Sequence, residues 1–208
     1  MKKPKFDLCL YLVADRSILG ERDFVSSLKE AIEGGVTLVQ LREKTSSTLE
    51  FYNMATQAKR ITDQYHVPLI INDRIDIAIA VDAAGVHLGQ DDMPAKIARE
   101  ILGPDKIIGI SASTISEAIS AQDAGADYLG VGSVFPTTSK DDAKQVTLET
   151  LKAIKQSVKI PIVGIGGINQ ENIKKVIDTG VDGAAVISAI FGKKDIKKAA
   201  EQLKKSFN

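Results

Sequence analysis

The chain of 208 residues is poor in several residue classes that would indicate particular kinds of protein. Its single cysteine, Cys9, excludes a disulfide within the chain, and the apolar residues around it predict a small buried side chain. Tryptophan is absent, so the core must be built mainly from aliphatic side chains. Lys and Arg balance Asp and Glu at 27 each, so no net charge attracts nucleic acid or an anionic membrane. Any attraction for anions must therefore be local.

The sequence also lacks a long hydrophobic run. The apolar segment that follows the basic N-terminal residues ends at Asp15, which is too short to span a bilayer, and no small-residue cleavage signal follows it. We therefore expect a cytoplasmic protein. Apolar residues make up 44% of the chain, enough for one sizeable core, and we expect a single domain over residues 1–208.

Short apolar segments recur along the whole chain and predict buried strands. They are continuously apolar, as parallel strands covered on both faces are, and lie at residues 8–13, 37–41, 69–72, 85–88, 107–111, 128–131, 162–165 and 183–187. Segments with helical spacing separate most of them, at residues 24–33, 49–65, 94–102, 116–124, 148–157 and 173–179. Eight such βα units with right-handed crossovers predict an α/β fold, a (β/α)8 TIM barrel. An open doubly wound sheet is the structural alternative.

Acidic residues follow two neighbouring predicted strands. Asn72 and Asp73 follow the third strand, and Asp91 and Asp92 follow the fourth. On a barrel these residues meet at the rim that carries active sites, where two carboxylates facing a phosphate suit Mg²⁺. The alternative is that one residue of each pair caps the following helix. Capping does not predict acids on adjacent strands beside Arg and Lys, so we favour the metal site.

Three further segments at the same ends of strands offer donors for anions. Alternation in the second strand places Gln40, Arg42 and Lys44 on one side, either as a salt-bridged strand end or as donors to a phosphate. The loop at 130–140 combines glycines, hydroxyls and a lysine, and is either an anion-binding loop or an ordinary surface loop. The loops after strands seven and eight are where barrels commonly hold a phosphate. His87 lies within a strand, which favours a hydrogen-bonded interior histidine over a metal ligand.

Taken in order, these motifs resemble the thiamine-phosphate synthase family, also called thiamine-phosphate pyrophosphorylase. The resemblance runs through residues 40–44, 71–74, 85–92, 135–140 and 166–168. It implies a (β/α)8 transferase that joins hydroxymethylpyrimidine diphosphate to hydroxyethylthiazole phosphate or its carboxylate. The products would be thiamine monophosphate and pyrophosphate. The implied partners are these small-molecule substrates, with no nucleic acid or membrane, and a homo-oligomer stays open.

The resemblance also implies a role for each matching position. Asp73 and Asp92 would bind Mg²⁺ as the cofactor. Contacts to the pyrimidine diphosphate would come from Gln40, Arg42, Lys44, Asn72, Ser111 and Lys140, and contacts to the thiazole phosphate from Thr137, Ser139, Gly167, Ile187 and Ser188, with Thr138 as a further substrate contact. Arg42, Lys44 and Lys140 would act in catalysis by neutralising charge on the departing pyrophosphate.

Two positions depart from the family pattern, and two other functions stay open. Ser139 stands where the family often has Thr, which keeps the hydroxyl, and Ser113 stands where many relatives have His. A thiazole tautomerase-like relative is one alternative, although the retained acids and cations argue against it. A non-catalytic regulator that binds a phosphate ligand is the other, although it gives no reason to retain the groups on the diphosphate side.

Overall fold

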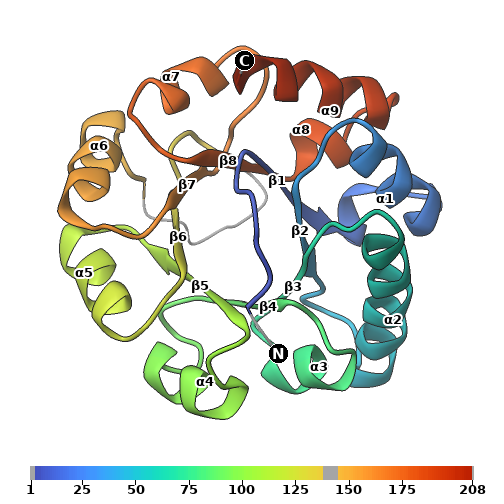
Figure 1. Ribbon diagram of the computed structural model, residues 1–208. Helices are drawn as coiled ribbons and strands as arrows, with labels where there is room; N and C mark the ends of the chain where they lie inside the picture. The colour runs from blue at the N-terminus through green and yellow to red at the C-terminus, as the bar shows by residue number, and fades with distance from the viewer. Residues whose placement is uncertain (1–2, 138–144, 208) are drawn as a thin grey trace.

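The computed structural model describes residues 3–137 and 145–207, and these residues form a closed barrel of parallel strands ringed by helices (Figure 1). Each strand pairs with the next, and the last pairs with the first. The strands are β1 (Leu10–Asp15), β2 (Leu38–Arg42), β3 (Leu69–Asn72), β4 (Gly85–Leu88), β5 (Ile107–Ala112), β6 (Tyr128–Val131), β7 (Ile162–Ile165) and β8 (Gly183–Val186). The predicted (β/α)8 barrel is confirmed, and the open sheet is not formed.

Helices follow the strands and cover the outside of the barrel (Figure 1). They are α1 (Phe24–Glu33), α2 (Thr48–Gln64), α3 (Ile75–Ala80), α4 (Ala95–Leu102), α5 (Ile115–Asp123), α6 (Leu148–Ser157), α7 (Ile173–Ile177), α8 (Ser188–Phe191) and α9 (Ile196–Lys204), with 3-10 turns at Arg16–Ile18 and Lys205–Phe207. Ser47 and Thr114 begin α2 and α5 with complete capping boxes, which satisfy N–H groups at those helix starts. No helix in the described ranges is long and apolar enough to cross a membrane.

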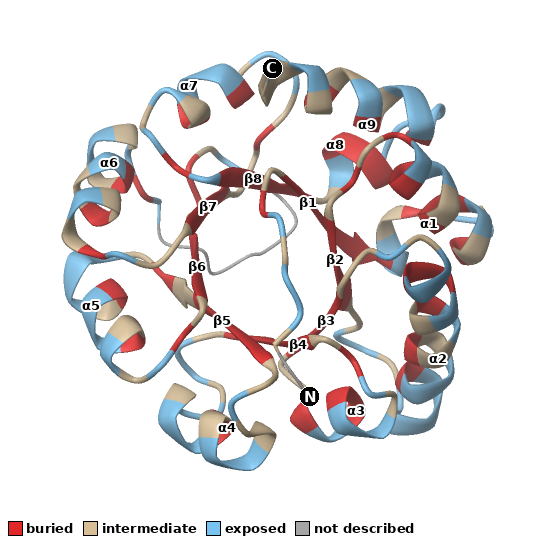
Figure 2. Ribbon diagram, in the orientation of Figure 1, coloured by how far each residue is buried: buried red, intermediate tan, exposed pale blue. Residues whose placement is uncertain are grey.

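The strands are buried on both faces, which explains why they read as continuously apolar (Figure 2). Outward-facing side chains such as Leu12 and Leu41 pack against the helices. Inward-facing side chains such as Tyr11, Leu38 and Ile70 fill the barrel. The alternation within each strand therefore sends one set of residues to the helix layer and the other to the interior, where polar side chains replace apolar ones toward the carboxyl ends.

The segment before β1 crosses the amino-terminal opening of the barrel (Figure 1). The ring of Phe6 packs on the ring of Tyr128, with centroids 5.9 Å apart, and Leu8 is buried among the interior residues. Lys3 forms an ion pair with Asp127 at the same end. Cys9 belongs to this segment and is only half-buried, so the prediction that it is a buried side chain was wrong. Residues 3–9 thus close the amino-terminal end of the barrel, and we call this segment the floor.

Candidate active site

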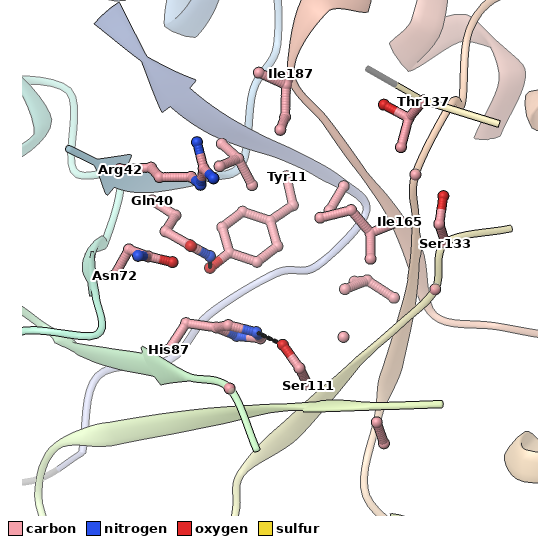
Figure 3. Close-up of a pocket in the computed structure, with 18 of the residues that line it drawn as sticks. Tyr11, Gln40, Arg42, Asn72, His87, Ser111, Ser133, Thr137, Ile165 and Ile187 are labelled. Atoms are coloured by element: carbon pink, nitrogen blue, oxygen red, sulfur yellow. Dashed lines mark hydrogen bonds between the residues drawn. The ribbon is translucent and has the colours of Figure 1, made fainter. Parts of the chain in front are cut away.

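A cavity of about 370 Å³ lies among the carboxyl ends of the strands (Figure 3). The described residues that the sequence predicted for the site all line it, namely Gln40, Arg42, Lys44, Asn72, Asp73, Asp92, Ser111, Thr137, Gly167, Ile187 and Ser188. Thr138, Ser139 and Lys140 lie outside the described residues. The structure thus brings together residues that are up to 148 positions apart, from Gln40 to Ser188.

Two carboxylates and a lysine meet at the end of β3. Lys44 Nζ donates a hydrogen bond to Asp73 Oδ2, and Asp73 lies within hydrogen-bonding reach of Asp92. Burial acts to raise the pKa of Asp73, but Lys44, Asp92 and Asn72 outweigh it and hold that pKa below its ordinary value. Burial and the neighbouring Asp73 raise the pKa of Asp92, although the Gly89 N–H opposes this. The pair therefore concentrates negative charge at one place on the rim.

The capping alternative for these acids does not agree with the structure. Helix α3 begins after Arg74 and has no side-chain cap, and α4 begins after Pro94, also without one. The carboxylate of Asp92 instead accepts a hydrogen bond of 2.7 Å from the N–H of Gly89. Asp73 has a φ of 60°, a strained conformation for a residue other than glycine and one that is concentrated at functional sites. Neither acid is placed there to start a helix.

The donor set at this rim fits Mg²⁺. Adjacent carboxylates that repel one another favour a bound cation, and the raised pKa of Asp92 records that repulsion together with its burial. No cluster of three or more His, Cys, Asp or Glu side chains suited to a metal occurs among residues 3–137 and 145–207. Mg²⁺ is commonly held by one or two carboxylates together with substrate phosphates and water, so two acids beside an anion site are sufficient.

Arg42 is held in the cavity by a partner that the sequence reasoning missed. Its Nη1 donates to Asp15 at the end of β1, and both side chains are largely buried. Asp15 also accepts hydrogen bonds from the N–H and hydroxyl of Ser17. The salt-bridged interpretation of the β2 strand end is therefore confirmed for Arg42, which also lines the cavity, while its role as a donor to a phosphate stays a prediction. Register pairs Asp15 with Arg42 on adjacent strands, a relation that only the barrel makes visible.

On the opposite side of the cavity, two glycines allow neighbouring segments to approach one another closely. Gly166 and Gly167 follow β7 with φ values of 100° and 62°. A Cβ at Gly166 would lie 2.2 Å from Ser133 Oγ, and one at Gly167 would lie 2.5 Å from the carbonyl oxygen of Pro136. Figure 3 shows Thr137 and Ile187 on this side, away from Gln40, Arg42 and Asn72. Polar groups thus lie on two sides of the cavity, Thr137 on one and Gln40, Arg42 and Asn72 on the other, and the two anion sites stay a prediction.

Buried polar side chains connect the two walls below these regions (Figure 3). Gln40 Nε2 donates to the Tyr11 hydroxyl at 2.7 Å, and Tyr11 and Tyr128 share a hydrogen bond of 2.7 Å. His87 bonds to Tyr128 through Nδ1 and to Ser111 through Nε2, both at 3.0 Å. The prediction of an interior hydrogen-bonded His87 is confirmed. The sequence reasoning missed both tyrosines, although polar rings in otherwise aliphatic strands were a signal for them.

Ser113, which departs from the pattern of the related sequences, lies on the cavity rim. Its hydroxyl donates to Glu117 Oε2 at 2.9 Å, and its N–H donates to the same oxygen at 2.6 Å. Glu117 also completes the capping box of α5. The serine therefore stabilises the start of α5, and its hydroxyl hydrogen is directed to Glu117 instead of into the cavity.

Comparisons with known proteins agree with this geometry. The family model described as thiamine monophosphate synthase matches residues 10–190. A thiamine-phosphate synthase of Clostridium tetani is 59% identical over 208 residues, covering 100% of both chains, and one of Clostridium acetobutylicum is 62% identical over 194 residues, covering 93% of this chain and 92% of its own. The solved thiamine phosphate pyrophosphorylase from Pyrococcus furiosus superposes with a TM-score of 0.89 at 48% identity, covering 96% of this chain and 95% of its own. This chain belongs to the thiamine monophosphate synthase family.

Proposed function

We propose that this chain is a thiamine-phosphate synthase that transfers the hydroxymethylpyrimidine group from its diphosphate to the nitrogen of hydroxyethylthiazole phosphate or its carboxylate. The observation that carries the proposal is the single cavity with two polar regions. One region holds Arg42, Lys44 and the acid pair, and the other is closed by Gly166 and Gly167. Two phosphorylated substrates that must meet end to end require such a pair of regions.

In the proposed reaction the bond between the pyrimidine methylene carbon and the diphosphate oxygen breaks, and the diphosphate leaves with the electron pair. The thiazole nitrogen then forms the new C–N bond with its lone pair, and where the thiazole carries the carboxylate, that group leaves as CO2 to give the same product. The aminopyrimidine ring releases electrons to the methylene carbon, so departure of the leaving group runs ahead of attack. The proposed reaction needs no protein nucleophile. The sequence suggested no Ser–His pair, but Ser111 and His87 do share a hydrogen bond in the cavity; the other ring nitrogen of His87 bonds to the Tyr128 hydroxyl, where a catalytic triad would have a carboxylate.

The side chains act on charge and orientation. Arg42, which is paired with Asp15, and Lys44, which is paired with Asp73, would neutralise the charge that develops on the departing diphosphate. Asp73 and Asp92 would hold Mg²⁺, which when bound supplies further positive charge to the same oxygens. The loops around Gly167 and Ser188 would hold the thiazole phosphate in line with the pyrimidine carbon. Lys140 is proposed to assist the departing diphosphate from the segment outside the described residues.

The test mixes the purified protein with both substrates and Mg²⁺ and follows thiamine monophosphate and pyrophosphate. We expect both products in equal amounts, and a strong loss of both with Asp92→Asn. A protein that makes neither product with any divalent cation contradicts the proposal. A thiazole tautomerase or a phosphate-binding regulator would also release no pyrophosphate, so one assay separates the synthase from both alternatives.

A further inference from the structure

The hydrogen-bond chain beneath the cavity has a direction, and that direction follows from the number of hydrogens available. Gln40 donates to the Tyr11 hydroxyl, which has one hydrogen of its own to pass on. Burial raises the pKa of both Tyr11 and Tyr128, so both phenols keep their hydrogens. The bonds from Tyr11 to Tyr128 and from Tyr128 to Nδ1 of His87 would each fit either direction. With Gln40 as the donor at one end, each phenol passes its own hydrogen onward if Tyr11 donates to Tyr128 and Tyr128 donates to Nδ1. Every hydrogen along this path has an acceptor.

The direction of these hydrogen bonds also decides which groups Gln40 and Ser111, at the two ends of the hydrogen-bond network, offer to a ligand. When Nδ1 of His87 accepts, the neutral imidazole carries its hydrogen on Nε2 and donates it to Ser111. The hydroxyl hydrogen of Ser111 is then directed elsewhere, and Ser111 lines the cavity. At the other end Gln40 gives one of its two amide hydrogens to Tyr11, and its oxygen is an acceptor for the cavity that Gln40 lines. One wall presents an acceptor, and the wall across from it presents a donor.

We propose that Tyr128 is a positioning residue that, from below the cavity, sets Gln40 as acceptor and Ser111 as donor for the substrate's aminopyrimidine ring. The inference rests on the proposed function, because that ring is the ligand. An aminopyrimidine carries an exocyclic amine that donates and ring nitrogens that accept, which matches the two walls. Tyr128 does not line the cavity, and its hydroxyl joins Tyr11 to His87. It acts on the ligand only through other residues.

The surrounding backbone is built to make room for this chain. A Cβ at Gly109 would lie 2.1 Å from Cζ of Tyr128, and a Cβ at Gly130 would lie 3.0 Å from Cε1 of His87. The Tyr128 side chain is fully buried and packs edge-on against Tyr11. Glycines at these two positions therefore admit two polar rings where larger residues would exclude them. A phenylalanine would fill the same space, so the hydroxyl of Tyr128 has a separate role from its ring.

Two consequences distinguish this role from packing alone. The oxo analogue of the pyrimidine exchanges the amine for a carbonyl and a ring nitrogen for an N–H, so it presents the opposite pattern to the same walls. It should bind more weakly, because unpaired polar groups are costly in a buried site. A substitution that no longer fixes the direction of the hydrogen bonds should reduce the preference for the aminopyrimidine over its oxo analogue. A substitution that only loosens packing should weaken the binding of both ligands alike.

The first experiment determines the direction of the hydrogen bonds in the absence of any ligand, from which ring nitrogen of His87 carries the hydrogen. The chain has two histidines, His66 and His87, and His66 is exposed, so ¹⁵N-labelled imidazoles give two separable sets of NMR signals near pH 8. We expect His87 to carry its hydrogen on Nε2. In Gln40→Glu the carboxylate can only accept, so the chain must reverse and Nδ1 of His87 must gain a hydrogen. Hydrogen on Nδ1 in the unsubstituted protein, or no change in Gln40→Glu, would overturn the inference.

The second experiment measures binding by calorimetry in Tyr128→Phe, with Tyr65→Phe as the matched control because Tyr65 bonds to Glu33 outside the cavity. With Mg²⁺ present, Tyr128→Phe should weaken pyrimidine diphosphate binding about five- to tenfold, the effect of one hydrogen bond. Inorganic pyrophosphate should bind within about twofold, and the preference over the oxo analogue should shrink. Equal loss for pyrophosphate, or an unchanged preference, contradicts the inference. If the unsubstituted protein binds neither pyrimidine, the proposed function fails, and the NMR result still decides the direction of the chain.

Discussion

Replacing Gly109 with alanine tests how tightly the interior of the barrel is packed. Gly109 lies in β5 without a positive φ, so alanine should by itself favour the strand, by roughly 0.5–1 kcal/mol. The structure predicts the opposite sign. The new Cβ would lie 2.1 Å from Cζ, 2.3 Å from the hydroxyl oxygen and 2.4 Å from Cε1 of Tyr128, whereas ordinary contacts begin at 3.4 Å. The ring must therefore move.

The Tyr128 ring has little freedom to move. It is fully buried, Phe6 and Tyr11 pack against it, and its hydroxyl bonds to Tyr11 and His87. Overpacking costs about 1–3 kcal/mol, and each hydrogen bond that the shift breaks adds about 1 kcal/mol. We therefore expect Gly109→Ala to lose about 2–5 kcal/mol, which for a chain of this length lowers the Tm by roughly 5–20 °C.

Urea unfolding and a thermal scan of Gly109→Ala measure this loss directly. Tyr128→Leu provides the matched background, because it removes the ring atoms that the new Cβ would meet. In that background, adding Gly109→Ala should cost less than about 1 kcal/mol, so the two substitutions should be strongly non-additive. A Tm for Gly109→Ala within about 2 °C of the unsubstituted protein would refute the packing argument, as would full additivity of the two losses.

Three further changes have defined outcomes. Because the folded-state pKa of Asp92 is raised, its ionisation destabilises the fold as pH rises, so Asp92→Asn should raise the Tm at pH 7 without Mg²⁺, and the gain should vanish in acid. Asp15→Asn removes the charge that partners the largely buried Arg42 and should cost about 1–3 kcal/mol in urea unfolding, whereas an unchanged midpoint would show that the ion pair contributes nothing. Phe6→Ala uncovers the floor at Tyr128 and should cost about 1–2 kcal/mol, read from the same unfolding curves.

The fold was predictable because its strands are buried on both faces and its helices have regular apolar spacing. The predicted boundaries of strands and helices fall within two residues of the observed ones. The first strand was placed two residues early because Leu8 is apolar, yet Leu8 is buried as part of the floor and not as part of the strand. The local pattern of apolar residues indicates which residues are buried. It does not distinguish a residue that closes one end of the barrel from a residue that belongs to one of its strands.

The site was predictable as far as the ends of strands define it. Polar residues that follow apolar strands meet on one rim, so the apolar pattern alone was enough to place Asn72, Asp73 and Asp92 together. The partner of Arg42 was missed because the first strand was predicted to end at residue 13, two residues before Asp15, so its register with Arg42 was not considered. Tyr128 could not either, since it lies at the start of β6 and reaches its partners only across the interior. Relations that run across the barrel require its closure to be known.

The polar groups at the rim of the cavity and those in the buried network beneath it differ in how well their hydrogen bonds and charges are satisfied. Beneath the cavity, Tyr11, Tyr128, His87 and Ser111 are joined by hydrogen bonds, so each of these polar side chains has a partner. At the rim, Asp73 holds a positive φ and lies against Asp92, so strain and like charge are stored where ligands bind. A cation shared by the two carboxylates would relieve that repulsion, whereas the buried network beneath the cavity holds no like charges for a cation to neutralise. Ligand binding should therefore stabilise the rim more than it stabilises the buried hydrogen-bond network beneath it.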